Sequence, residues 1–168
     1  MIKVVVSGAL GRMGKRLQVL INLDKKLETI GGIDQTRGVF DGVEVFTEPE
    51  EIVKSGDIII DFSSPELTVK VLDECVKASK PIVIGTTGLD DHAMKKINKF
   101  SEYIPILQSP NMSLGVNLLF SLTKIATSIL KKDFEIEIME IHHHHKKDAP
   151  SGTAMKLGEI IAKEKNKE

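Results

Sequence analysis

The segment from Glu140 to Thr153 places imidazoles, ammonium groups and a helix-opening Ser-Gly-Thr within fourteen residues. Four consecutive histidines, His142 to His145, are followed directly by Lys146 and Lys147. Residues 151–153 then have the composition of a helix start, whose backbone N–H groups and dipole attract anions. Basic side chains beside a helix start predict an anion site. We expect a small carboxylic acid there, because nucleotide phosphates have a loop of their own earlier in the chain.

Proton transfer is the second chemistry that this segment predicts. If a hydride is delivered to a conjugated C=N or C=C bond, a lysine or histidine is the natural donor of the accompanying proton. Adjacent histidines also bind zinc or nickel, but closed structural zinc sites usually add cysteines or a second ligand pair, so we predict no metal. Surface positions for His144 and His145 are the remaining alternative.

A glycine-rich turn is the second candidate site. Gly8, Gly11 and Gly14 lie between an apolar run and a helical pattern, where such glycines permit a tight turn, close approach of a phosphate and close packing of helix on strand. Asp34 follows Gly14 by twenty residues, at the distance where a carboxylate accepts hydrogen bonds from the adenosine ribose. The pattern predicts dinucleotide binding; a merely structural turn is the alternative.

The choice between NADH and NADPH stays open at this level. Asp34 disfavours a 2′-phosphate, whereas Arg37 is close enough in sequence to neutralise one. Arg12 and Lys15 add positive charge near the turn, although a solvated helix face explains them equally well.

Two further turns carry hydroxyl groups at the ends of predicted strands. Residues 61–64 and 85–88 offer hydroxyl and backbone donors to the nicotinamide ribose, the carboxamide or a substrate, because ligands bind at this edge of open α/β sheets. Helix capping is the alternative for Ser63 and Ser64, and turn formation is the alternative for Thr86 and Thr87. Asn111 and Asn117 stand at the predicted passage between the two domains, and turn and cap positions explain them equally well.

Apolar periodicity supplies the elements that position these groups. Short apolar runs predict strands at residues 2–6, 29–33, 58–60, 81–84 and 104–107, and helical patterns alternate with them. This alternation is typical of a Rossmann-type, doubly wound parallel sheet. A longer helix at 114–130 and an alternating strand at 134–138 predict a different α+β arrangement afterwards. We therefore expect a dinucleotide-binding domain at 1–110 and a substrate domain at 111–168.

Composition excludes several classes of protein. The 168 residues include 23 basic and 24 acidic side chains, a net charge of −1, which predicts binding to neither nucleic acid nor an anionic membrane. The single cysteine, Cys75, has no intrachain disulfide partner and fits a buried position. No apolar run approaches the length of a membrane span, and we expect a cytoplasmic protein.

Taken together, these motifs resemble the 4-hydroxy-tetrahydrodipicolinate reductase (dihydrodipicolinate reductase) family. The segments that carry the resemblance occur in the family's order, and the last is the most specific: Gly8 to Gly14, Asp61 to Pro65, Gly85 to Gly88, Ser109 to Asn117 and His142 to Thr153. The resemblance implies an oxidoreductase that reduces 4-hydroxy-tetrahydrodipicolinate to tetrahydrodipicolinate with NADPH or NADH, in the diaminopimelate route of lysine biosynthesis.

The resemblance also implies roles for individual residues. His142 matches a proton donor or acceptor and Lys146 a proton donor. The predicted substrate site comprises His143, Lys146, Ser151, Gly152 and Thr153. The predicted cofactor site, from position and resemblance together, comprises Gly8, Gly11, Arg12, Met13, Gly14, Asp34, Arg37, Phe62, Ser63, Gly85, Thr86, Thr87, Ser109, Asn111 and Met112.

Two departures from the family pattern affect these expectations. His144 stands where many members carry arginine or asparagine. Members also continue past this helix with further strands, so we expect an incomplete substrate domain. The resemblance implies a small dicarboxylate substrate. It also implies a homotetramer, which the missing strands put in doubt. The alternatives are a regulatory module that binds NAD(P)H without turnover and another dehydrogenase of small amino or keto acids.

Overall fold

The computed structural model describes residues 1–130, 133–144 and 149–165. The chain divides into an N-terminal unit, Met1–Ser109, and a C-terminal unit, Pro110–Glu168, which are described separately. Across the described residues no helix is both long and apolar enough to span a membrane.

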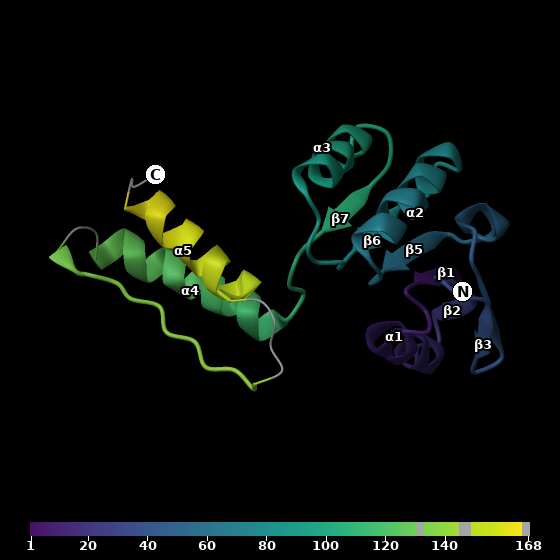
Figure 1. The fold of residues 1–168 in the computed structure, drawn as a ribbon, viewed down its shortest axis with the longest axis horizontal. Coiled ribbons are helices and arrows are strands. Elements are labelled where there is room, and N and C mark those ends of the chain that lie inside the picture. The colour runs from purple at the N-terminus through teal and green to yellow at the C-terminus, as the bar shows by residue number, and fades with distance from the viewer. Residues whose placement is uncertain (131–132, 145–148, 166–168) are drawn as a thin grey trace. The chain divides into compact units, whose positions relative to one another are not determined.

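A twisted sheet forms the centre of the N-terminal unit (Figure 1). Its strands lie in the order β3-β4-β2-β1-β5-β6-β7, and every neighbouring pair is parallel except β3 with β4. This order confirms the predicted Rossmann-type fold. The strands are β1 (Ile2–Ser7), β2 (Leu27–Ile33), β3 (Gly38–Phe40), β4 (Val43–Phe46), β5 (Ile58–Asp61), β6 (Ile82–Ile84) and β7 (Ile106–Gln108).

Helices cover both faces of this sheet, which explains why its central strands are mainly apolar. Helix α1 (Arg12–Leu23) lies on one face, while α2 (Pro65–Lys77) and α3 (Asp91–Phe100) lie on the other (Figure 1). Val4 and Val6 of β1 pack in the α1 cluster, and Val5 between them packs in the α2 cluster. Side chains of one strand thus alternate between two buried layers.

Capping residues set the starts of α2 and α3, and for Ser64 this is the capping alternative considered from the sequence. The Ser64 side chain accepts a hydrogen bond from the Leu67 N–H at 3.3 Å, with Pro65 in the first turn. The Asp90 side chain accepts one from the Ala93 N–H at 2.8 Å. Both caps satisfy N–H groups that have no partner inside the helix.

The β3–β4 hairpin was missed by the sequence reasoning. Asp41 and Gly42 form its turn with positive φ angles of 51° and 78°. An Asp-Gly pair between short apolar segments is a hairpin signal and would have revealed it. Strand β4 then pairs with β2 in parallel, so the hairpin extends the sheet on the side of Asp34. Two short 3-10 turns, Pro49–Glu51 and Val53–Ser55, lead from it towards β5.

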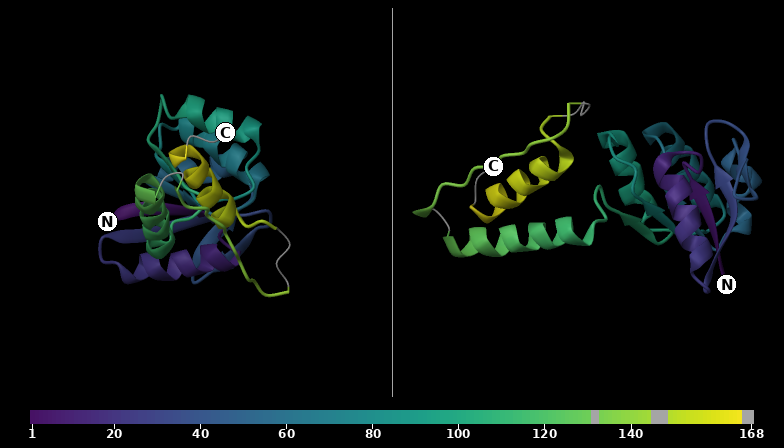
Figure 2. Two further views of the ribbon diagram at one scale, coloured as in Figure 1. Left: turned by 90° about the vertical axis from the view of Figure 1, so that its left-hand side faces the viewer. Right: turned by 90° about the horizontal axis from the view of Figure 1, so that it is seen from below.

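The C-terminal unit consists of two packed helices and an extended segment. Helix α4 (Leu114–Leu130) has the predicted bounds and packs against α5 (Gly152–Glu164), as Figure 2 shows. The Ser151 Oγ accepts a hydrogen bond from the Ala154 N–H at 3.1 Å and caps α5.

The prediction of a strand at residues 134–138 is wrong. In the described part of the chain this segment pairs with no other strand, and its apolar side chains Phe134 and Ile138 are exposed. Alternating polarity fits a strand with one wet face, but a strand also needs a neighbour to satisfy its backbone groups. The segment instead runs extended near α5, with the Ile138 side chain close to Gly158.

Candidate nucleotide and substrate sites

The glycine turn after β1 is shaped by contacts that leave no space for side chains. Gly8 has φ +78°, and a Cβ there would lie 2.2 Å from the Phe62 carbonyl oxygen. A Cβ on Gly14 would lie 2.0 Å from the Gly8 oxygen. Gly11 is less restricted: it is exposed at the N-cap of α1, and a Cβ there would lie 3.2 Å from the Gly8 oxygen. Gly8 and Gly14 therefore fix the turn, and Gly11 leaves its outer surface open.

Gln18 braces the same turn from inside and was missed by the sequence reasoning. Its side chain is fully buried, and its Nε2 donates to the Ala9 oxygen at 2.8 Å and to the Gly14 oxygen at 3.2 Å. The one available signal was a polar residue at a helix position facing the sheet, four residues after Gly14. Buried polar groups of this kind usually hold backbone in a fixed shape.

Asp34 ends β2 at the side of this turn. Its Oδ2 accepts from the Leu10 N–H and its Oδ1 from the Gln35 N–H, each at 2.8 Å. The half-buried carboxylate is thus fixed at the edge of a cavity of about 390 Å³. The cavity is lined by Gly8, Leu10, Gly11, Asp34, Gln35, Phe62, Ser63, Ser64 and Leu67.

A buried carboxylate, Asp61, organises the next two turns. It is fully buried and accepts hydrogen bonds from the Ser63 Oγ at 2.5 Å, the Thr68 Oγ1 at 2.6 Å and the Thr86 Oγ1 at 2.7 Å. The Thr86 Oγ1 in turn accepts from the Ser63 N–H at 2.9 Å. The sequence reasoning read this turn for its hydroxyl groups and missed that Asp61 holds them.

The predicted residues of the β6 turn separate into two kinds. Thr86 is buried and engaged with Asp61, which is the structural alternative, while Thr87 is exposed beside it. A Cβ on Gly85 would lie 2.3 Å from the Phe62 ring, so the ring leaves no space for a side chain at position 85. The structure brings Gly8, Phe62 and Gly85 into one packed group.

The remaining predicted cofactor residues are less closely grouped. Arg12 and Met13 are exposed at the start of α1, and Arg37 is paired with Glu51. The Ser109 N–H donates to the Ile84 oxygen at 3.1 Å. In the C-terminal unit, the Asn111 Oδ1 accepts from the Ser113 N–H at 2.9 Å and so forms a turn before α4, and Met112 is exposed.

Glu140 connects the histidine segment to the start of α5. Its Oε1 accepts from the Ser151 N–H at 2.8 Å, and its Oε2 lies 3.0 Å from the His142 Nε2. The hydrogen bonds of the Ser151 side chain and backbone, together with His142, lower the pKa of Glu140 to about 2. Glu140 therefore stays ionised and holds both partners at neutral pH.

Of the predicted substrate site, Lys146 falls outside the described residues, as do its neighbours His145 and Lys147. His143, His144 and Gly152 are exposed, and Thr153 is half-buried, with its Oγ1 3.5 Å from the Asn111 Nδ2. Among the residues that the structure describes, no three metal-binding side chains are gathered in a way that would hold an ion.

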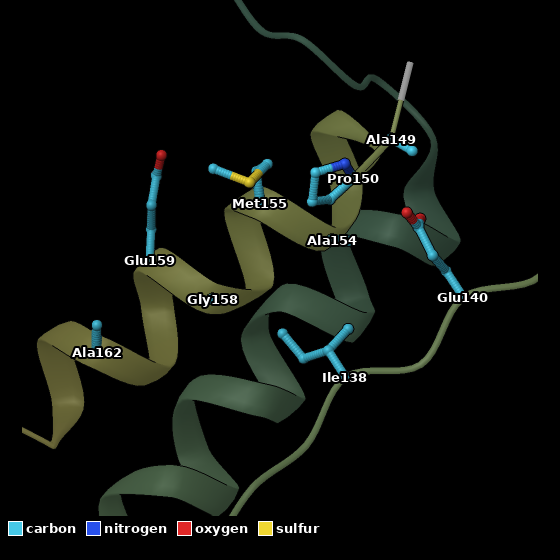
Figure 3. A pocket seen from close by; sticks show the side chains of 9 residues that line it. All are labelled: Ile138, Glu140, Ala149, Pro150, Ala154, Met155, Gly158, Glu159 and Ala162. Atoms are coloured by element: carbon cyan, nitrogen blue, oxygen red, sulfur yellow. The ribbon is translucent and has the colours of Figure 1, made fainter. Parts of the chain in front are cut away.

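A cavity of about 770 Å³ lies between the extended segment and α5. Figure 3 shows Ile138 and Glu140 on the extended segment and the other lining side chains on or just before α5. Its walls are mainly apolar, with Glu140 and Glu159 as the charged members; the lining residues are Ile138, Glu140, Ala149, Pro150, Ala154, Met155, Gly158, Glu159 and Ala162.

We predict that Asp61→Asn destabilises the N-terminal unit by about 1 to 3 kcal/mol, because an amide nitrogen would face hydroxyl donors in a buried site. Native-state hydrogen exchange of the β5 and β6 amides measures this locally. Asp24→Asn is the matched control, since the Asp24 carboxylate also accepts a hydrogen bond, from the Lys26 N–H, but is exposed. Equal protection in both variants would contradict the assignment.

A second prediction concerns the titration of Glu140, followed by carboxyl ¹³C NMR. The midpoint should lie at about 2, and Ser151→Ala should raise it towards the ordinary 4.5. Because the folded pKa is the lower one, the stabilisation is full above about 4.5 and is lost as the pH falls towards about 2. Ser128→Ala on α4 should leave the titration unchanged; a wild-type midpoint near 4.5 would refute the contact.

Known proteins share both regions of the chain. Residues 2–112 match the family described as "Dihydrodipicolinate reductase, N-terminus", and residues 115–168 match "Dihydrodipicolinate reductase, C-terminus". The 4-hydroxy-tetrahydrodipicolinate reductase of Aquifex aeolicus is 46% identical over 96% of this chain, and that of Syntrophotalea carbinolica is 41% identical over the same share. The chain spans 66% of the length of each.

Solved structures show the same relation. The dihydrodipicolinate reductase of Paenisporosarcina sp. TG-14, described as dipicolinate bound, matches 98% of this chain and 67% of its own at 26% identity and a TM-score of 0.82. Aspartate dehydrogenase from Thermotoga maritima, at 18% identity and a TM-score of 0.56 over 73% of this chain and 52% of its own, shares the fold alone. The resemblance noted in the sequence is confirmed, and the chain belongs to the dihydrodipicolinate reductase family.

Proposed function

We propose that this chain acts in the reduction of 4-hydroxy-tetrahydrodipicolinate to tetrahydrodipicolinate, in lysine biosynthesis through diaminopimelate, with NADH or NADPH as reductant. The observation that carries the proposal is the row of turns at the carboxyl edge of the sheet. Asp34, the glycine turn and the Phe62–Ser63 turn line one cavity, in a chain that matches both regions of the reductase family.

The strand order supports one orientation of the bound dinucleotide along the carboxyl edge of the sheet. The chain moves from β1 to β2 on one side and later to β5 on the other, and ligands bind at such a switch point. The adenosine ribose belongs beside Asp34, and the pyrophosphate belongs over the open surface of Gly11, at the start of α1. The nicotinamide end then extends towards Ser63, Gly85 and Thr87. When bound, the cofactor supplies the hydride.

The C-terminal unit supplies groups for an anionic substrate. The backbone N–H groups of Gly152 and Thr153, in the first turn of α5, suit a carboxylate, and His142 is oriented by an ionised Glu140. The family pattern assigns His142 as a proton donor or acceptor in the reduction and Lys146 as the proton donor. The dipicolinate of the Paenisporosarcina relative is a compact dicarboxylate of the kind that this arrangement would take.

The proposal also covers the location and the oligomeric state of the enzyme. We place the activity in the cytoplasm, in the homotetramer that the family resemblance implies. About one third of the length of the two curated relatives has no counterpart in this chain. The activity of this chain should therefore be compared with that of the chain extended by the part of the relatives that it lacks.

The deciding experiment is oxidation of NADPH or NADH by the chain, with substrate generated from pyruvate and aspartate semialdehyde by the preceding synthase. We expect oxidation that depends on the synthase and falls at least a hundredfold in Lys146→Ala. Lys156→Ala is the matched control, because Lys156 is an exposed lysine of α5 paired with Glu159 at 2.9 Å. Binding of reduced nucleotide without oxidation, both in this chain and after fusion of the relatives' remaining third, would refute the reductase and leave a nucleotide-binding module.

Asp34→Asn gives a further prediction. The amide oxygen still accepts from the Leu10 N–H, but the group loses its charge and one acceptor for the ribose hydroxyls. Hydrogen bonds to charged groups contribute about 1.5 to 3 kcal/mol, so NADH should bind about tenfold or more weakly. NADPH affinity should change less than threefold. Isothermal titration calorimetry measures both, and an equal loss for the two nucleotides would show that Asp34 does not contact the ribose.

A further inference from the structure

We propose that the site selects NADH over NADPH, because the β3–β4 hairpin and Glu51 hold the nearby basic side chains away from the adenosine 2′ position. The inference rests on the proposed nucleotide site and names its ligand more narrowly. It concerns Arg37 and Lys15, two of the three basic residues that the sequence places near the site, the third being Arg12.

Arg37 is held on three sides. Its Nη2 forms an ion pair with Glu51, its Nη1 lies 4.0 Å from Glu44, and its guanidinium lies 5.7 Å from the centre of the Phe46 ring. Each contact alone is weak at an exposed position. To reach a 2′-phosphate, however, the guanidinium must leave all three contacts together.

Lys15 contacts an aromatic ring on the other strand of the same hairpin, β3. Its Nζ lies 5.6 Å from the centre of the Phe40 ring. Phe40 belongs to β3 and Phe46 to β4, so one hairpin places an aromatic face under each cation. Aromatic rings attract cations through the negative charge of their faces, and this attraction competes with a phosphate for both side chains.

The space beside Asp34 is acidic. A cavity of about 260 Å³ shares four of its lining residues with the nucleotide cavity and therefore adjoins it. Three carboxylates and one ammonium group line it, and neither Arg37 nor Lys15 is among the lining residues of either cavity. The residues of the smaller cavity are Asp34, Gln35, Thr47, Glu48, Ser64, Glu66, Leu67 and Lys70.

This charge distribution decides between the two nucleotides. The three carboxylates exceed Lys70 by two negative charges, and a phosphate monoester would bring about two more at neutral pH. The 2′-hydroxyl of NADH carries no charge and can donate to Asp34 instead. Separately, backbone and Ser64 hydrogen bonds lower the pKa of Glu66, which keeps its charge in place.

Direct titration tests the inference without any assay of turnover. Dissociation constants for NADH and NADPH are measured by nicotinamide fluorescence and calorimetry on the whole chain, at low and at high salt. We expect NADH to bind at least tenfold more tightly at low salt, with the gap narrowing as salt screens the carboxylates. Equal affinities, or tighter NADPH, would overturn the inference; binding of neither nucleotide would overturn the proposed function and the inference with it.

Variants identify the hairpin as the cause. The double change Glu44→Gln and Glu51→Gln frees Arg37, so NADPH should bind about three- to tenfold more tightly while NADH changes less than twofold. Glu50→Gln, at a neighbouring exposed glutamate, is the matched control. Adding Arg37→Ala to the double variant should abolish the gain. Arg37→Ala alone should leave NADPH affinity within twofold, and a loss of fivefold or more would show that Arg37 already contacts the phosphate.

Discussion

The Asp61 carboxylate is the interaction on which the nucleotide edge of this protein depends. It is buried at the end of β5, and its hydrogen bonds come from hydroxyl groups on its own turn, on α2 and on the β6 turn. Removing a carboxylate from water is costly unless donors replace the lost hydration. Because those donors are Ser63, Thr68 and Thr86, satisfying one buried charge fixes two loops and a helix start together.

Phe62 extends this constraint to the glycine turn. Its carbonyl oxygen occupies the space where Gly8 would carry a side chain, and its ring occupies the corresponding space at Gly85. The turns after β1, β5 and β6 are therefore in mutual contact around one residue. A nucleotide lying along this edge meets a rigid surface formed before it arrives, which lowers the entropy that binding must overcome.

The sequence predicts those parts of the molecule that depend on local patterns. Apolar runs such as residues 2–6 identify strands covered on both faces, and Ser64 identifies a helix start, because burial and capping leave clear signatures. Gln18 and Asp61 escape prediction as supports since their partners are fixed only by tertiary contacts. Residues 134–138 show the opposite error: their alternation is real, but pairing depends on a neighbouring strand, which the segment's own composition cannot reveal.

The β3–β4 hairpin also bears on how such a site can change over evolutionary time. It is joined by a two-residue turn at one side of the sheet. Val45 is buried in the core and Phe46 packs against the core, whereas Glu44 is exposed. Of the groups that surround Arg37, Glu44 is therefore separable from those that stabilise the fold. Substitutions at Glu44 alter an exposed position with little penalty in folding, so nucleotide preference can drift between lineages while the framework of the site stays intact.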